Sequence, residues 1–115
     1  MIERMDTVCL KVHDVTASSS WYQETLGFKE SSRGDGYRVL SIGDSGTALT
    51  IEEGDEGTLP GNHAYPIFFA KDIEQTRTKL MEQAIKVSEI KKEGRNTFFD
   101  VYDLDNNKLQ VCYWE

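Results

Sequence analysis

Cysteine is scarce in this sequence. The chain of 115 residues has only Cys9 and Cys112, which stand near opposite ends of the chain. Two cysteines so placed make neither a disulfide framework nor the paired spacing of a zinc site. We therefore expect a reduced, cytoplasmic location, in which both cysteines are small buried side chains and not nucleophiles.

Long apolar runs and an excess of basic residues are also missing. No run approaches the roughly 20 apolar residues that cross a bilayer, and the first residues contain no apolar signal core. The 20 acidic side chains outnumber the 13 basic ones, which gives a net charge of −7. This charge disfavours nucleic acid, which attracts basic surfaces. We expect neither a nucleic-acid nor a membrane partner, and we expect a small-molecule ligand that is neutral or cationic.

One order of elements is written twice along the chain. Alternating apolar residues predict strands, and helical spacing predicts a helix between Asp14, a typical N-cap residue, and Gly27, a typical C-cap residue. Asp72 opens a second predicted helix. The predicted strands cover residues 7–12, 28–33, 37–42 and 47–52, and then 65–70, 87–91, 97–102 and 108–114. Strand, helix and three strands are thus repeated, which indicates an internal duplication.

A segment rich in glycine separates the two repeats. Its sequence, EGDEGTLPGN over residues 53–62, has almost no apolar side chain. A chain of 115 residues fits one domain of ordinary size. We therefore predict a single α+β domain over 1–115, with module one at 1–53, a linker at 54–63 and module two at 64–115.

Two stretches of sequence match a known family. They are VHDVTASSSWYQETLGF at residues 12–28 and DLDNNKLQ at residues 103–110. With the duplicated order, they make the chain resemble the vicinal oxygen chelate superfamily, which includes glyoxalases, extradiol dioxygenases, and fosfomycin- and bleomycin-resistance proteins. The resemblance implies two tandem βαβββ modules that form a concave, barrel-like mixed sheet with the helices outside. It also implies a homodimer.

The resemblance implies four positions for metal ligands in the metal-dependent members. Those positions hold Thr7, Thr50, Pro66 and Gln110 in this sequence. Divalent metals of this kind prefer imidazole, thiolate or carboxylate groups. A shift of two residues in the fourth strand would supply Glu52, but one carboxylate does not hold a catalytic metal. We therefore expect no metal and no other cofactor.

Hairpin pairing predicts which side chains share a face of each sheet. Residues 40, 42, 49 and 51 form one apolar face, and residues 99, 101, 109 and 111 form another. The opposite faces mix aromatic and polar side chains, and the resemblance turns them toward a cavity. The candidate ligand-binding residues are Tyr37, Val39, Thr50, Glu52, Phe68, Phe98, Asp100, Tyr102, Gln110 and Trp114.

The preferred hypothesis is a metal-free protein that binds a small hydrophobic or cationic molecule in this cavity, similar to bleomycin-resistance proteins. Aromatic walls with a few placed polar groups are typical of such sites. The first alternative is a metal-dependent lyase or oxidoreductase of the glyoxalase or dioxygenase kind with displaced ligands. A second alternative is that the aromatic face is a filled core or a dimer interface. We predict no catalytic residue, although Glu52 and Asp100 are the groups to test if acid–base chemistry survives.

Overall fold

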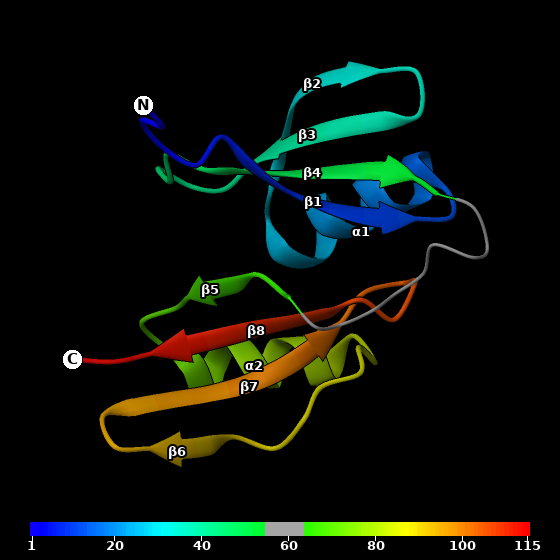
Figure 1. Ribbon diagram of the computed structural model, residues 1–115. Coiled ribbons are helices and arrows are strands. Elements are labelled where there is room, and N and C mark those ends of the chain that lie inside the picture. Colours follow the sequence, from blue (N-terminus) through cyan, green and yellow to red (C-terminus); the bar gives the residue numbers. More distant parts are fainter. Residues whose placement is uncertain (55–63) are drawn as a thin grey trace. The chain divides into compact units, whose positions relative to one another are not determined.

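Each repeat folds into its own sheet with one helix on one face (Figure 1). The computed structural model describes residues 1–54 and 64–115, and the chain divides into two compact units, Met1–Pro60 and Gly61–Glu115. The predicted linker lies outside the described residues, apart from Gly54 at its start. Within the described ranges, neither helix has the length and apolar character needed to cross a membrane.

The two units have the same topology. The first contains β1 (Thr7–Val12), α1 (Val15–Leu26), β2 (Lys29–Gly34), β3 (Tyr37–Ser41) and β4 (Ala48–Glu53). The second contains β5 (Ile67–Phe69), α2 (Ile73–Glu82), β6 (Lys91–Glu93), β7 (Asn96–Tyr102) and β8 (Lys108–Tyr113). The strand orders are β1-β4-β3-β2 and β5-β8-β7-β6, and the first strand of each unit runs parallel to the last. The predicted α+β class and the duplicated βαβββ order are confirmed, in two open mixed sheets.

Both helices begin at their predicted N-cap residues, and α1 ends at its predicted C-cap. The Asp14 carboxylate accepts hydrogen bonds from the backbone N–H groups of Thr16 and Ala17, at 3.0 and 3.1 Å. Gly27 ends α1 with a φ of 77°, a left-handed conformation that favours glycine, and its N–H donates to Gln23 O. In the second unit the Asp72 carboxylate accepts from the N–H of Gln75. These caps fix where each helix leaves its sheet.

The central hairpins have the predicted register. Leu40 pairs with Leu49 and Val39 with Thr50, while Val101 pairs with Leu109 and Phe99 with Val111. Side chains of a strand alternate between faces, so this register sends one apolar set under each helix. That set is buried, and it comprises Leu40, Leu49, Ile51, Phe99, Val101, Leu109 and Val111.

Two predicted strands are wrong in their bounds. The strand predicted at 65–70 is shortened to β5, Ile67–Phe69. The segment 87–91 was expected to be a strand, whereas β6 covers Lys91–Glu93. Val87 makes only an isolated bridge to Val101, and the neighbouring backbone bonds join Ser88 to Asp100 and Lys86 to Tyr102. The chain therefore meets β7 at two separate places, because the residues between them leave the ladder.

A polar network ties β2 to α1 in the first unit. The Glu30 carboxylate accepts from Arg33 Nε at 2.8 Å and from Ser19 Oγ at 3.1 Å, and it lies 3.3 Å from Arg38 Nε. The side chains of Arg38 and Glu30 are only 12% and 18% exposed. Gln23 on α1 completes the network by donating to Ser19 Oγ and accepting from the Glu30 N–H.

We predict that Glu30→Gln lowers the free energy of unfolding at neutral pH. The pKa of Glu30 is held below its ordinary value of 4.5. The causes are the hydrogen bonds from Arg33 and Ser19 and the positive charges of Arg33 and Arg38. A carboxyl whose pKa is lowered on folding stabilises the protein above its unfolded pKa, and the stabilisation is lost as the pH falls through the folded value. Urea denaturation at neutral and acidic pH would measure the difference.

The matched control is Glu24→Gln, since Glu24 is an exposed carboxyl on α1. Its effect on unfolding should be small at every pH. A Glu30 variant that unfolds like the wild type at neutral pH would rule out a stabilising role for this network.

Candidate functional site

Four of the predicted ligand-binding residues lie together on the first sheet. Tyr37 pairs with Glu52 and Val39 with Thr50, on the central strands β3 and β4. They share the face opposite the one that carries Leu49 and Ile51, which is covered by α1. The sequence-based grouping of these four side chains on one face therefore agrees with the register.

Polar contacts on this face join β1 to β4. The hydroxyl groups of Thr7 and Thr50 lie 2.7 Å apart, and Thr7 also donates to Ala48 O at 3.0 Å. Lys11 forms an ion pair with Glu52. Because of this ion pair, Glu52 presents a compensated charge and not a lone carboxylate.

The Tyr37 ring lies across a glycine on the neighbouring strand. Gly34 on β2 pairs with Tyr37, and a Cβ added at Gly34 would overlap the atoms of the Tyr37 ring. An aromatic ring can lie directly on the backbone of a cross-strand glycine, whereas a larger side chain at that position would occupy the same space. Gly34 thus sets the position of an aromatic side chain that is 38% exposed on the candidate face.

The second sheet brings together five of the predicted residues. Phe98 pairs with Cys112 and Asp100 with Gln110, while Tyr102 pairs with Lys108. These residues lie on the face opposite Phe99 and Val111. The same face continues past the end of β8 to Trp114, which is 58% exposed and packs edge-on against Phe69 at 5.5 Å.

The predicted placement of Phe68 is wrong. Phe68 pairs with Val111, so it lies on the helix-covered face, while Ile67 and Phe69 take the face of Gln110 and Cys112. The physical reason is the lack of alternation in this short strand. Three consecutive apolar residues give no pattern from which a face can be read.

Lysines compensate the polar groups of the second face. Asp100 accepts from Gln110 Nε2 at 3.2 Å, and Lys108 Nζ lies 3.9 Å from its other oxygen. The Lys108 ammonium also lies 4.1 Å from the centre of the Tyr65 ring. Lys86 makes the equivalent contact with Tyr102 at 4.5 Å. Both carboxylates among the candidate ligand-binding residues, Glu52 and Asp100, are therefore already paired with a lysine.

Three residues of these contacts were missed from the sequence. Lys108 could have been found, because the pairing of Val101 with Leu109 also sets Lys108 opposite Tyr102. Tyr65 and Lys86 stand outside the strands and helices, where no periodic pattern reveals a side chain's direction.

The two cysteines differ in exposure. Cys112 is buried as expected, whereas Cys9 is exposed. Cys9 lies on the same face of the first sheet as Glu52, and its Sγ atom is 3.9 Å from Glu52 Oε2. Partial burial and the Glu52 charge raise the pKa of Cys9, and burial raises that of Cys112. Both thiols therefore stay protonated at neutral pH, which makes them poor nucleophiles.

The four family ligand positions do not fit a divalent metal. Thr7 and Thr50 are hydrogen-bonded to each other, Pro66 has no donor group on its side chain, and Gln110 is bound to Asp100. Within residues 1–54 and 64–115, no group of three or more His, Cys, Asp and Glu side chains is placed to hold a metal ion. The hydroxyl and amide groups of this set serve as hydrogen-bonding groups.

We predict that Gly34→Ala moves the Tyr37 ring away from β2 without unfolding the protein. The new methyl group occupies the space of the ring, and the side chain must take another rotamer, which costs about 1 kcal/mol. The ring resonances of Tyr37 in NMR spectra and urea denaturation would measure both effects. The control is Gly46→Ala, since a Cβ at Gly46 meets open space. Unchanged Tyr37 resonances in the Gly34 variant would contradict the prediction.

Comparisons with solved structures show the fold of this chain in other proteins. TnmS3, an antibiotic binding protein from Streptomyces sp. CB03234, is similar at 18% identity and a TM-score of 0.85, over 99% of this chain and 98% of that one. The fosfomycin resistance protein FosX from Listeria monocytogenes, complexed with Mn(II) and sulfate, is 16% identical with a TM-score of 0.82, over 100% and 93%. A lactoylglutathione lyase from Agrobacterium tumefaciens is 14% identical with a TM-score of 0.78, over 97% and 94%.

The sequence itself also matches a family model. A comparison with curated protein sequences finds no significant match. The model of the Glyoxalase/Bleomycin resistance protein/Dioxygenase superfamily, however, matches residues 4–111. This match covers nearly the whole chain and agrees with the duplicated βαβββ units. The chain therefore belongs to the Glyoxalase/Bleomycin resistance protein/Dioxygenase superfamily.

Proposed function

We propose that this protein binds a small hydrophobic or cationic organic molecule on the sheet faces opposite its helices, and that it does so without a metal. The residues proposed for this role are Tyr37, Val39, Thr50 and Glu52 in the first unit and Phe98, Asp100, Tyr102, Gln110 and Trp114 in the second. We propose no catalytic residue, because the two carboxylates of these faces, Glu52 and Asp100, are each paired with a lysine.

The observation that carries the proposal is the composition of these faces. Aromatic side chains that are not fully buried stand beside a few polar groups whose charges are paired, as in the contacts of Glu52 with Lys11 and of Asp100 with Lys108 and Gln110. Aromatic surface with a few placed polar groups is typical of small-molecule sites. The paired charges favour an aromatic or otherwise apolar body over a ligand recognised by charge alone.

The solved structures with this fold support more than one outcome. TnmS3 is an antibiotic binding protein, which is the kind of activity proposed here. The alternative, a metal-dependent lyase or oxidoreductase, is favoured by FosX with its Mn(II) ion and by the lactoylglutathione lyase. The hydroxyl, amide and proline side chains at the four ligand positions argue for the binding protein.

We predict that a ligand of this class quenches the fluorescence of Trp114. The chain has two tryptophans, and the indole of Trp114 is exposed on the candidate face while Trp21 packs edge-on against Tyr22 in α1. A thermal-shift screen of aromatic antibiotics and planar organic cations would select ligands, and a fluorescence titration would follow. Loss of the aromatic contact in Trp114→Ala should weaken binding about tenfold.

Trp21→Phe is the matched control, because it removes the other indole and should leave both the quenching and the affinity unchanged. Elemental analysis of protein purified without chelators belongs to the same experiment. A stoichiometric divalent ion, or binding that disappears with EDTA, would contradict the metal-free proposal. A screen without any saturable ligand would contradict binding itself.

We further propose that the protein is a cytoplasmic homodimer. The scarcity of cysteine supports the location, and the family resemblance supports the dimer. Sedimentation equilibrium should give about twice the 13.1 kDa mass of one chain. A monomer at all concentrations would contradict the dimer.

A further inference from the structure

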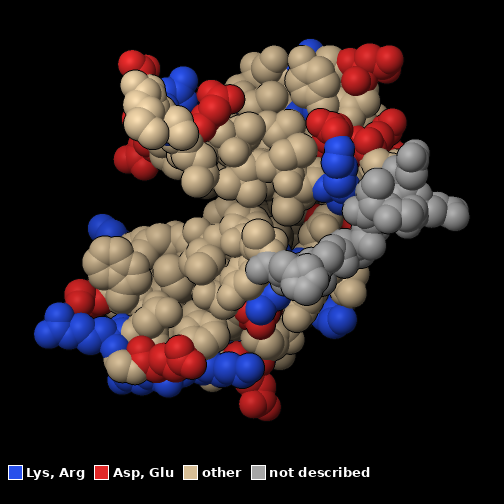
Figure 2. Space-filling view, in the orientation of Figure 1, with Lys and Arg blue, Asp and Glu red and all other residues tan. Residues whose placement is uncertain are grey.

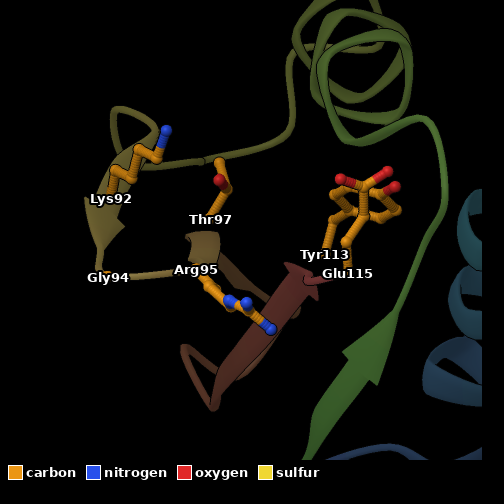
Figure 3. A pocket seen from close by; sticks show the side chains of 6 residues that line it. All are labelled: Lys92, Gly94, Arg95, Thr97, Tyr113 and Glu115. Carbon is orange, nitrogen blue, oxygen red and sulfur yellow. The ribbon is translucent and has the colours of Figure 1, made fainter.

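A pocket of about 440 Å³ opens at one end of the second unit (Figure 3). It lies where β6, β7 and the turn between them meet the end of β8. Its volume is within the range of small-molecule sites. The lining residues are Lys92, Gly94, Arg95, Thr97, Tyr113 and Glu115.

The strand register explains why these side chains meet. Lys92 pairs with Thr97 and Thr97 with Tyr113, so the three form one row across β6, β7 and β8. Because residues two apart share a face, this row continues the face of Phe99 and Val111. It therefore lies opposite Phe98 and Asp100, and the pocket is distinct from the face proposed for the hydrophobic ligand.

The pocket holds two cations without partners. Within the described residues, the side chains of Lys92 and Arg95 form no hydrogen bond and no ion pair, and both residues are exposed. By contrast, Lys11, Arg33 and Lys108 all lie against carboxylates. Two unpaired cations in one hollow of a chain with a net charge of −7 are a local reversal of its charge. Figure 2 shows basic side chains gathered along the β6 edge of this unit, with acidic ones among them.

The side chains are arranged on two sides of the pocket. Lys92 and Thr97 lie on one side and Tyr113 and Glu115 on the other, with Arg95 at the turn (Figure 3). Burial, the Glu115 charge and a hydrogen bond to Glu115 raise the pKa of Tyr113, so its hydroxyl stays protonated and donates to the Glu115 carboxylate. The Lys92 ammonium, the Arg95 guanidinium and the Thr97 hydroxyl remain as donors around this hollow, and Glu115 is the one acidic residue among those that line it.

We propose that this pocket binds the oxyanion group, a phosphate or a carboxylate, of a small molecule. Lys92 and Arg95 supply the opposite charge, and charge-assisted hydrogen bonds of this kind are among the strongest in proteins. Thr97, which lies in the middle of the row, donates a further hydrogen bond from its hydroxyl group. The negative charge of Glu115 repels the anion and therefore lowers the affinity that the two cations provide.

The test is an NMR titration with inorganic phosphate at low ionic strength. The amide resonances of Gly94, Arg95 and Thr97 should shift with one saturable curve, while those of Val39 and Thr50 stay in place. A parallel titration with acetate distinguishes the two sources of the group: tighter binding of phosphate assigns a phosphate ester, and tighter binding of acetate assigns a carboxylate.

Charge variants give the direction of each effect. Lys92→Gln and Arg95→Gln should each weaken binding about tenfold, the loss expected for one charged hydrogen bond. Lys91→Gln is the matched control, because Lys91 pairs with Phe98 and lies on the other face of the same strand. Glu115→Gln should strengthen binding about threefold by removing a like charge.

Two outcomes would overturn the proposal. One is the absence of saturable shifts at the pocket with either anion. The other is an equal loss of affinity in the Lys91 and Lys92 variants, which would show general attraction to a basic edge. Failure of this test leaves the hydrophobic ligand untouched, since the two sites lie on opposite faces of the sheet.

Discussion

The alternation of side chains in the two central hairpins is the constraint on which the rest of the structure depends. In β3–β4 and in β7–β8, directly paired residues divide into an apolar set beneath the helix and a mixed set on the opposite face. A slip of one residue would exchange the two sets, so burial of Leu49 or Phe99 also fixes where Thr50 and Phe98 point. Core and candidate site are therefore specified by a single register in each unit.

This dependence explains which parts could be predicted from the sequence. The hairpins at residues 37–52 and 97–114 carry clear alternation, and Asp14, Gly27 and Asp72 carry recognisable capping chemistry, so these elements were predicted. The face of Phe68 could not be predicted, because β5 has three apolar residues in succession and joins the sheet through a distant parallel strand. The bounds of β6 were predicted wrongly for a related reason. This strand, Lys91–Glu93, has no apolar side chain that would mark a buried face.

The electrostatics could be predicted only in part. The ion pair of Lys11 with Glu52 joins positions far apart in sequence, whereas the place of Lys108 near Asp100 follows from the register of their hairpin. Glu52 and Asp100 were candidate ligand-binding residues in an acidic chain, and each lies beside a lysine. The net charge of the chain therefore says little about the charge of either face. Lys92 and Arg95 are the opposite case, since neither forms an ion pair within the described residues, and the overall charge of −7 does not reveal the two cations in their pocket.

The parallel pairing of the first strand with the last in each unit bears on how the chain folds during synthesis. Thr7 pairs with Ala48, and Ile67 pairs with Gln110, so neither sheet can be completed until its final strand has been made. Closing loops of this length costs entropy that only the finished ladder repays, which slows folding. The first unit can nevertheless complete its own ladder while the second is still being translated, because β1 finds its partner within the same unit. The duplication thus divides one long search for non-local pairs into two shorter ones.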